Sequence, residues 1–195
     1  MSPKFLEALA RPQPDPGGGS AAAFGARVAL ALMEKVVRLE YQRPRNSDES
    51  RAFWEKTWQE IQEIGYKLED LQEGDIRAYF HLTRALAGDD EVALARAVQE
   101  AVQCPGEIII QAHRALNLLI SIGPKCRSYL ISDLQVACEL LGGALLGAYY
   151  IARANLPLFR DDQDRRREKA RLHEWRDTAL ASRNRARAAL NDRAP

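Results

Sequence analysis

The chain has 195 residues, of which 46% are hydrophobic and 28% charged, and its formal net charge is +1. This length suits one domain, or one domain with an appendage, and the near-neutral charge argues against nucleic-acid binding through bulk charge. The N-terminal residues contain no apolar run typical of a signal peptide. The three cysteines (Cys104, Cys126 and Cys138) show no paired spacing, and the three histidines are scattered. We therefore expect a cytoplasmic protein with reduced cysteines and no metal site.

Hydrophobic residues recur with a helical period along nearly the whole chain, and no segment alternates as a strand would. A short amphipathic segment is expected over 2–10, and the first long helix over 19–41. Three glycines precede this helix, and Ser20 stands where an N-cap residue belongs. Free N–H groups and the helix dipole would make this segment an anion-binding site. A flexible hinge before a capped helix is the alternative.

The middle of the chain predicts further helices separated by glycine and proline. Ser47 is a candidate N-cap for a helix over 48–73, which Gly74 either ends or merely interrupts before 75–87. The expected segments that follow are helices over 90–103 and 106–122 with a kink or break at Pro105-Gly106, a loop over 123–127, and the most hydrophobic helix over 128–154.

The most hydrophobic helix carries Gly142, Gly143 and Gly147 on or near one face, where another helix could pack closely. Its mainly apolar part, residues 140–152, is too short to span a bilayer and is typical of a buried helix. We expect the helix to end at Asn155-Leu-Pro157, because proline does not continue a helix.

The tail differs from the body in charge. Residues 160–195 hold 11 Lys and Arg against 7 Asp and Glu, a net of +4, which leaves −3 on residues 1–159 (17 against 20). Sparse apolar positions predict a solvated helix docked by one stripe and frayed near Pro195, and RNA binding is the alternative. The chain would then divide into a helical domain over 1–160 and a basic helix over 161–195.

Two aspartates stand among apolar residues, where a helical bundle seldom places an acid without a partner or a task. Asp75 follows Gly74, and Asp133 lies near the start of the most hydrophobic helix. Asp75 would be an N-cap if the helix breaks at Gly74, and Asp133 would be an acid favoured by the helix dipole. Either would alternatively be a partly desolvated carboxylate with a pKa suited to general-base work.

The segment Pro14-Asp-Pro-Gly-Gly-Gly-Ser-Ala-Ala-Ala23 resembles the signature of the cyclodeaminase/cyclohydrolase family of folate enzymes. This family includes the C-terminal domain of formiminotransferase-cyclodeaminase and the methenyltetrahydrofolate cyclohydrolases. Further segments resemble the family in order and spacing over about residues 3–160: Glu73-Gly-Asp-Ile-Arg-Ala-Tyr79, Cys104-Pro105, Ser132-Asp-Leu-Gln-Val-Ala137 and Asn155-Leu156.

The resemblance implies an all-α bundle of long, partly kinked helices that forms a homodimer and binds a tetrahydrofolate derivative as substrate, without a cofactor, nucleic acid or membrane. Asp75 and Asp133 are the candidate catalytic residues, because a carboxylate favours a cationic methenyl carbon and can deprotonate the attacking water. The candidate folate-binding residues are Gly17, Gly18, Gly19, Ser20, Tyr79, Lys125, Arg127, Ser132 and Asn155.

We expect hydrolysis of 5,10-methenyltetrahydrofolate to 10-formyltetrahydrofolate, since no transferase domain is attached to supply a formimino substrate. The formimidoyltetrahydrofolate cyclodeaminase reaction is one alternative. Another is a non-catalytic folate-binding or structural dimer, because the chain departs from the family pattern at 39–45, at Gly123-Pro124 and at 149–155.

Overall fold

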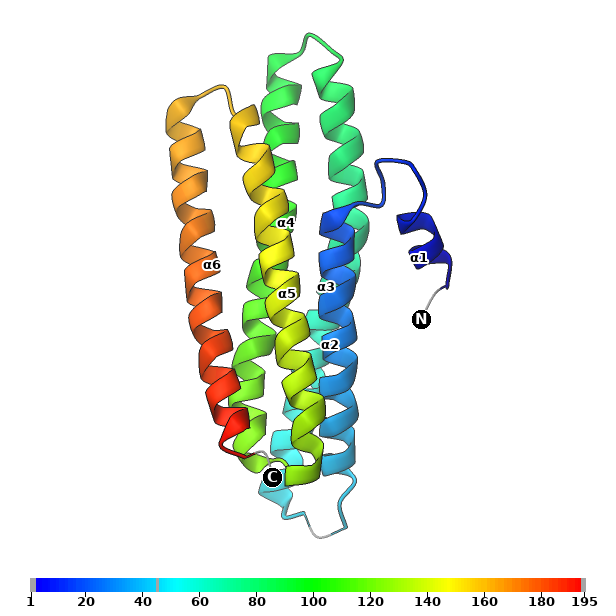
Figure 1. The fold of residues 1–195 in the computed structure, drawn as a ribbon, viewed down its shortest axis with the longest axis vertical. Coiled ribbons are helices and arrows are strands. Elements are labelled where there is room, and N and C mark those ends of the chain that lie inside the picture. Colours follow the sequence, from blue (N-terminus) through cyan, green and yellow to red (C-terminus); the bar gives the residue numbers. More distant parts are fainter. Residues whose placement is uncertain (1–2, 45, 194–195) are drawn as a thin grey trace.

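A computed structural model describes residues 3–44 and 46–193, and this part of the chain is built from helices without a strand (Figure 1). The all-α prediction is therefore confirmed. In chain order the α-helices are α1 (Pro3–Leu9), α2 (Gly18–Tyr41), α3 (Asp48–Leu86), α4 (Glu91–Ile122), α5 (Ile131–Asn155) and α6 (Asp162–Asn191). Short 3-10 helices occupy Gly123–Lys125, Ser128–Leu130 and Leu156–Leu158.

Four long helices, α2 to α5, form an antiparallel bundle, and α6 lies along α4 and α5 (Figure 1). The helix order alternates in direction because the connections are short, which makes consecutive helices antiparallel neighbours. Helix α1 lies beside the start of α2, where the tilted rings of Phe5 and Phe24 pack with centroids 4.9 Å apart. The core lies between the four bundle helices and continues under α6.

Helix α2 begins at the second of the three glycines, one residue before its expected start. The N-cap position belongs to Gly17, so the assignment of Ser20 as N-cap is wrong, and Ser20 is fully buried in the first turn. No described glycine has a positive φ, and Gly18 and Gly19 have helical geometry. The hinge interpretation is wrong as well, because Gly18 and Gly19 form part of the helix and Gly17 is its N-cap.

Helix α3 runs unbroken through Gly74, so a break there is ruled out and Asp75 is not an N-cap. A glycine inside a helix costs roughly 0.5–1 kcal/mol. Burial of Leu71 and Ala78 on either side continues the apolar face across it, and helices in proteins owe most of their stability to such packing. Ser47 caps α3 as predicted, since its side chain accepts a hydrogen bond from the Ser50 N–H.

Helix α4 is also continuous, so the possible break at Pro105-Gly106 does not occur. Both residues are buried. A Cβ added at Gly106 would lie 2.7 Å from the Trp175 ring of α6, so the glycine admits this ring to the helix surface. Close packing against Trp175 therefore explains why position 106 is a glycine, although the sequence suggested that a helix could end there.

Helix α5 packs against α2, α4 and α6, and its glycines do not share one face as expected. A Cβ at Gly142 would meet Arg183 of α6, and one at Gly147 would lie 3.6 Å from Ala22 of α2. A Cβ at Gly143 would have no atom within 4 Å. Contrary to expectation, residues 128–158 are long and apolar enough to cross a membrane, judged by length and composition only, and 50% of the most apolar window is buried.

Helix α6 is docked by one stripe, as predicted, with Leu172, Ala179, Ala186 and Leu190 buried. The predicted fraying near Pro195 falls outside the described residues. The division of the chain at residue 160 stays a prediction. The helix that follows this boundary is joined to the bundle by buried side chains along its length.

Candidate functional site

The glycine-rich start of α2 lies directly against Asp75 of α3. The Ser20 backbone N–H donates to Asp75 Oδ2 at 2.8 Å. Ser20 Oγ is 3.1 Å from the same oxygen and 2.9 Å from the Gln72 carbonyl oxygen, so its one proton is shared between two acceptors. The first turn of α2 thus contacts the Asp75 carboxyl group of the same chain, and the anion-binding site for a ligand stays a prediction.

The close approach of the two helices requires glycine at position 19. A Cβ built there would lie 2.0 Å from Asp75 Oδ1, far inside any allowed contact. A Cβ at Gly18 would lie 2.8 Å from the Ile151 side chain of α5, which is a flexible group. The glycines of this segment are therefore needed for proximity, with Gly19 the strictest position.

The environment of Asp75 changes its acidity. Burial raises the pKa of this carboxyl above its usual 3.8, and the hydrogen bonds from Ser20 lower the pKa by a smaller amount. The described hydrogen bonds from Ser20 both reach Oδ2, and no described hydrogen bond reaches Oδ1. A carboxyl with a raised pKa and one uncommitted oxygen suits proton transfer.

A cavity of about 200 Å³ opens beside this contact. Its walls include Asp75, Tyr79 and Asn155 together with the three glycines. Asn155 Nδ2 donates to the Ala101 carbonyl oxygen of α4 at 2.9 Å, which fixes the amide at the wall. Among the described residues, the N–H groups of Gly18 and Gly19 have no acceptor, and they too are available to a ligand.

The cavity is smaller than an ordinary ligand site, which measures roughly 300–1,000 Å³. A larger cavity of about 560 Å³ lies at the α3–α4 turn, where polar side chains such as His81, Arg84 and Glu100 line it. That larger cavity contains none of the site residues expected from the sequence. No group of three or more His, Cys, Asp or Glu in the described ranges is arranged to hold a metal ion.

The second candidate acid lies elsewhere in the chain. Asp133 is in the first turn of α5, and its Oδ2 forms an ion pair with Lys35 Nζ of α2 at 2.8 Å. Lys35 is fifteen residues beyond Ser20 in α2, about 22 Å along the helix axis at 1.5 Å per residue. Asp133 and the adjacent Ser132 are therefore not brought together with Asp75 within one chain.

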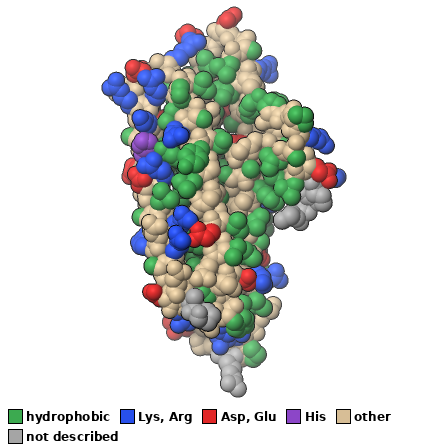
Figure 2. Space-filling view, viewed as in Figure 1, with side chains coloured by type: hydrophobic (Ala, Val, Ile, Leu, Met, Phe, Trp, Pro, Cys, Tyr) green, Lys and Arg blue, Asp and Glu red, His purple; other side chains and the backbone are tan. Residues whose placement is uncertain are grey.

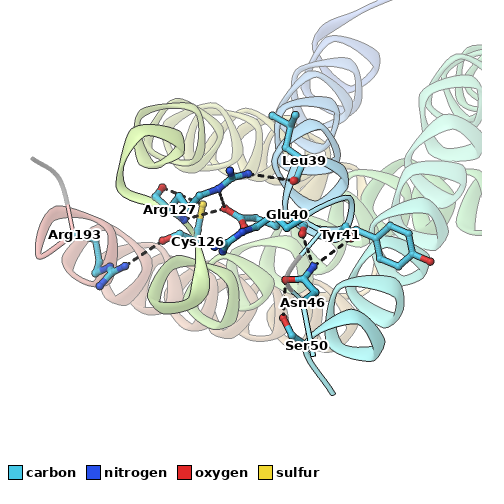
Figure 3. Close-up of polar contacts among 9 residues, drawn as sticks. Leu39, Glu40, Tyr41, Asn46, Ser50, Cys126, Arg127 and Arg193 are labelled. Atoms are coloured by element: carbon cyan, nitrogen blue, oxygen red, sulfur yellow. Dashed lines mark hydrogen bonds and ion pairs between the residues drawn. The ribbon is translucent and has the colours of Figure 1, made fainter. Parts of the chain in front are cut away.

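The basic candidates lie near Asp133 as well. The N–H and Nε of Arg127 donate to Glu40 Oε1 at 3.0 and 2.9 Å, and its Nη2 donates to the Leu39 carbonyl (Figure 3). Glu40 is fully buried. Lys125 sits over the Phe53 ring with its Nζ 4.8 Å from the centroid. The Arg127 guanidinium thus binds Glu40 and the Leu39 carbonyl oxygen in the described structure.

Sequence reasoning missed Glu40, Lys35 and Ile151. Glu40 could have been found, because it stands four residues after Val36 and seven after Met33, both on the buried face of α2. Lys35 gives no such signal, since an exposed lysine on a helix is ordinary. Ile151 is one of many aliphatic residues in α5.

The chain is similar to known proteins in sequence and in fold. A model of the formiminotransferase-cyclodeaminase family matches residues 2–174. Among solved structures, the chain is similar to the formiminotetrahydrofolate cyclodeaminase of Thermotoga maritima, with a TM-score of 0.90 and 23% identity over 98% of this chain and 96% of that one. No curated protein sequence matches. At this identity the structural likeness establishes a shared fold.

Proposed function

This chain belongs to the formiminotransferase-cyclodeaminase family, and we propose that it catalyses the cyclodeaminase reaction on a formimino derivative of tetrahydrofolate. The family is one of folate enzymes. The observation that supports catalysis most directly is the partly buried Asp75 carboxyl, which has a raised pKa and lines a cavity at the start of α2. The name of the structurally similar protein also favours deamination over hydrolysis.

In this reaction N10 of the folate attacks the carbon of the protonated formimino group (–CH=NH2+) attached to N5, and the positive charge ends on the methenyl product. The N10–C bond forms, N10 loses its proton, and the bond from that carbon to the departing nitrogen breaks as ammonia leaves. Asp75 would accept the N10 proton and return it to the leaving nitrogen, so the carboxyl ends the cycle unchanged. A raised pKa assists both steps, because proton transfer is efficient when donor and acceptor are closely matched.

The rest of the cavity wall would orient the substrate. Tyr79 offers an aromatic face and a hydroxyl, and the Asn155 amide is held in place by the Ala101 carbonyl. The Gly18 and Gly19 N–H groups would donate to a carbonyl or carboxylate oxygen of the folate. These roles are part of the proposal, as are the homodimer, the cytoplasmic location and the absence of a cofactor.

Hydrolysis of 5,10-methenyltetrahydrofolate is the second candidate, because the same carboxyl would deprotonate a water attacking the methenyl carbon. Its support in the sequence was the lack of an attached transferase domain. That support is weak, since a formimino substrate could equally come from a separate protein. The cyclodeaminase reaction is therefore the preferred proposal.

The test supplies the purified protein with each substrate in turn. With 5-formiminotetrahydrofolate, we expect the absorbance of the methenyl product to rise and one ammonia to be released per product. Accelerated loss of that absorbance from 5,10-methenyltetrahydrofolate, without deamination, would instead establish the cyclohydrolase. Folate binding by calorimetry without turnover would support a non-catalytic relative, and no binding at all would reject all three.

A further inference from the structure

The Ser20 hydroxyl lies between two acceptors on α3. Its Oγ is 3.1 Å from Asp75 Oδ2 and 2.9 Å from the Gln72 carbonyl oxygen, and the residue is fully buried. A serine hydroxyl carries one proton, which turns about the Cβ–Oγ bond towards either partner. Because both oxygens are within hydrogen-bond distance, the hydroxyl can change its acceptor by rotation alone, without a shift of any heavy atom.

The Ser20 backbone N–H is a different kind of donor, because its direction is fixed by helix α2. It donates to Asp75 Oδ2 at 2.8 Å. Oδ2 therefore has one permanent donor and one that can turn away, whereas no described hydrogen bond reaches Oδ1. A proton on Oδ2 would compete with these two donors, so a proton that arrives at the carboxyl binds Oδ1 more favourably.

The Ser20 side chain is set apart from the space that a substrate would occupy. Asp75 and the three glycines before Ser20 line the cavity of about 200 Å³, but Ser20 does not. A substrate in this cavity would contact the Asp75 carboxyl and not the serine hydroxyl. Any influence of the hydroxyl on the reaction therefore passes through the carboxyl.

The other titratable groups near the carboxyl come from several parts of the chain. Asp15, ahead of α2, and Tyr79 on α3 line the same cavity, to which α5 contributes an amide and an aliphatic side chain. Cys104 on α4 stays neutral, because burial and the nearby carboxylate raise the pKa of its thiol to about 12. Arg77, two residues further along α3, is paired with Glu73 at 3.5 Å.

Within the described ranges, no cation offsets the burial of Asp75. Burial raises the pKa of this carboxyl, and the Ser20 hydrogen bonds lower it. Arg27 of α2 is bound to the Gln72 side chain at 2.8 Å and to Glu69 at 2.6 Å. Figure 2 shows hydrophobic side chains over α5 and α2, with many charged side chains along α6. Ser20 is thus the residue that stabilises the charged form of the carboxyl.

We propose that Ser20 is a positioning residue whose hydroxyl turns between Asp75 and the Gln72 carbonyl as the carboxyl loses and gains the transferred proton. This role rests on the proposed function, in which Asp75 takes a proton from N10 and returns it to the leaving nitrogen. While the carboxyl is charged, the hydroxyl donates to Oδ2, because hydrogen bonds to charged groups are the stronger kind. Once the proton is on Oδ1, the neutral carboxyl is a weaker acceptor and the hydroxyl donates to the carbonyl.

The second acceptor keeps the hydroxyl hydrogen-bonded in both protonation states. A buried hydroxyl without a partner would cost free energy and would oppose protonation of the carboxyl. Because the Gln72 carbonyl takes over this bond, the two states of Asp75 stay close in free energy, and the proton transfers efficiently in both directions. The serine proton stays on Oγ throughout, so the number of protons in the reaction is unchanged.

The first experiment follows Asp75 without a substrate. Protein labelled with carbon-13 at the aspartate carboxyl carbons is titrated by NMR, and the Asp75 signal is assigned by its loss in Asp75→Asn. In Ser20→Ala the midpoint should move to higher pH by about one pH unit or more, because the charged carboxylate loses a hydrogen bond. Ser182→Ala is the matched control, since Ser182 is also fully buried but binds Arg185 on α6, and its midpoint should equal that of wild type. Equal midpoints in wild type and Ser20→Ala would overturn the proposal.

The second experiment detects the change of acceptor. In wild type the chemical shift of the Gln72 carbonyl carbon, read through the Glu73 amide, should follow the Asp75 titration, because the carbonyl gains a hydrogen bond as the carboxyl is protonated. In Ser20→Ala this response should be much smaller. A carbonyl that follows the titration equally in both proteins would rule out the rotation. Ser20→Cys replaces Ser20→Ala in both experiments if the alanine variant does not fold, because a thiol is a weak donor.

The third experiment separates this role from the proposed function. With a formimino derivative of tetrahydrofolate, the acidic limb of kcat against pH should move to higher pH in Ser20→Ala, because the carboxyl must be charged to accept a proton. KM should change little, since Ser20 does not line the cavity. A change confined to KM would contradict the proposal. If the wild type turns over neither folate, the proposed function fails, while the NMR titrations still decide whether the hydroxyl changes its acceptor.

Discussion

At Asp75 two physical effects act on the carboxyl in opposite directions. The Ser20 hydrogen bonds favour the charged form, and burial disfavours it. The raised pKa means that burial dominates, so ionising this carboxyl costs more free energy in the native state than in the unfolded state. The residue is therefore expected to contribute to activity at a cost in stability.

Asp75→Asn should lower turnover by roughly 10²-fold or more, the effect expected when a general acid–base group is lost. The same variant should melt at a higher temperature than wild type at neutral pH. Because the pKa is raised in the folded state, this difference should vanish below the ordinary value of 3.8 and grow as the pH rises through the folded pKa. Melting curves by circular dichroism from pH 3 to 8 check the sign, and a lower melting temperature at neutral pH would contradict it.

Gly19→Ala should inactivate the protein, because its Cβ would occupy the space 2.0 Å from Asp75 Oδ1. We expect a loss of roughly 1–3 kcal/mol in unfolding free energy, as for other overpacked sites. Gly25→Ala on the same helix is the matched control, since nothing lies within 4 Å of its added Cβ. It should gain roughly 0.5–1 kcal/mol in urea unfolding and keep its activity. Equal losses in both variants would refute the role assigned to the contact.

At the scale of the helix, packing across the bundle outweighs local preference. Helix α3 continues through Gly74, and α4 continues through Pro105, because the buried faces on both sides belong to one core. A residue that weakens a helix locally therefore has a different effect at each position, set by what the neighbouring helix places beside it.

Alanine substitutions at two glycines test how the neighbouring helix determines the effect on stability. Gly74→Ala should stabilise the protein by roughly 0.5–1 kcal/mol, because the closest atom to its Cβ is Cys104 Sγ at 3.4 Å. Gly106→Ala should destabilise it by roughly 1–3 kcal/mol, because the Trp175 ring is 2.7 Å away and must move. Hydrogen exchange should show the loosening confined to α6 in Gly106→Ala, and unchanged exchange there would argue against this contact.

At the scale of the molecule, the buried Glu40 lies at the centre of a polar cluster that joins the ends of several helices. Its carboxylate accepts bonds from Arg127 and Arg43, and Asn46 donates to its backbone carbonyl (Figure 3). Arg193 reaches the same region through the Cys126 carbonyl. The cluster thus joins the end of α2, the turns before α5 and the end of α6.

Arg127→Ala should cost roughly 3 kcal/mol, because it leaves a buried carboxylate with only one cationic partner. Lys125→Ala is the control, since an exposed lysine over an aromatic ring contributes about 0.5–1 kcal/mol. Urea unfolding with unchanged m-values measures both. A similar small loss in the two variants would show that Arg127 is not essential to the cluster.

The sequence predicted what depends on neighbours along the chain. The helical period marked α2 and α6, and Ser47 was recognised as a cap from its position before an apolar run. The sequence suggested possible helix breaks at Gly74 and Pro105, and neither occurs. The free energy that each residue costs the helix is offset by packing against helices distant in the sequence. The resemblance singled out the glycine-rich start of α2, whose role in ligand binding stays a prediction. The separation of Asp133 from Asp75 depends on the length and direction of α2 and α5, which no local pattern specifies.

The contact between Gly19 and Asp75 also constrains which sequences this fold can accept. The carboxylate of one residue fills the volume that a side chain on the other would need. The two positions therefore behave as one site, and the free energies of changes at both should not add. An alanine at 19 would be tolerated far better where position 75 has lost its carboxylate, so the two positions should covary.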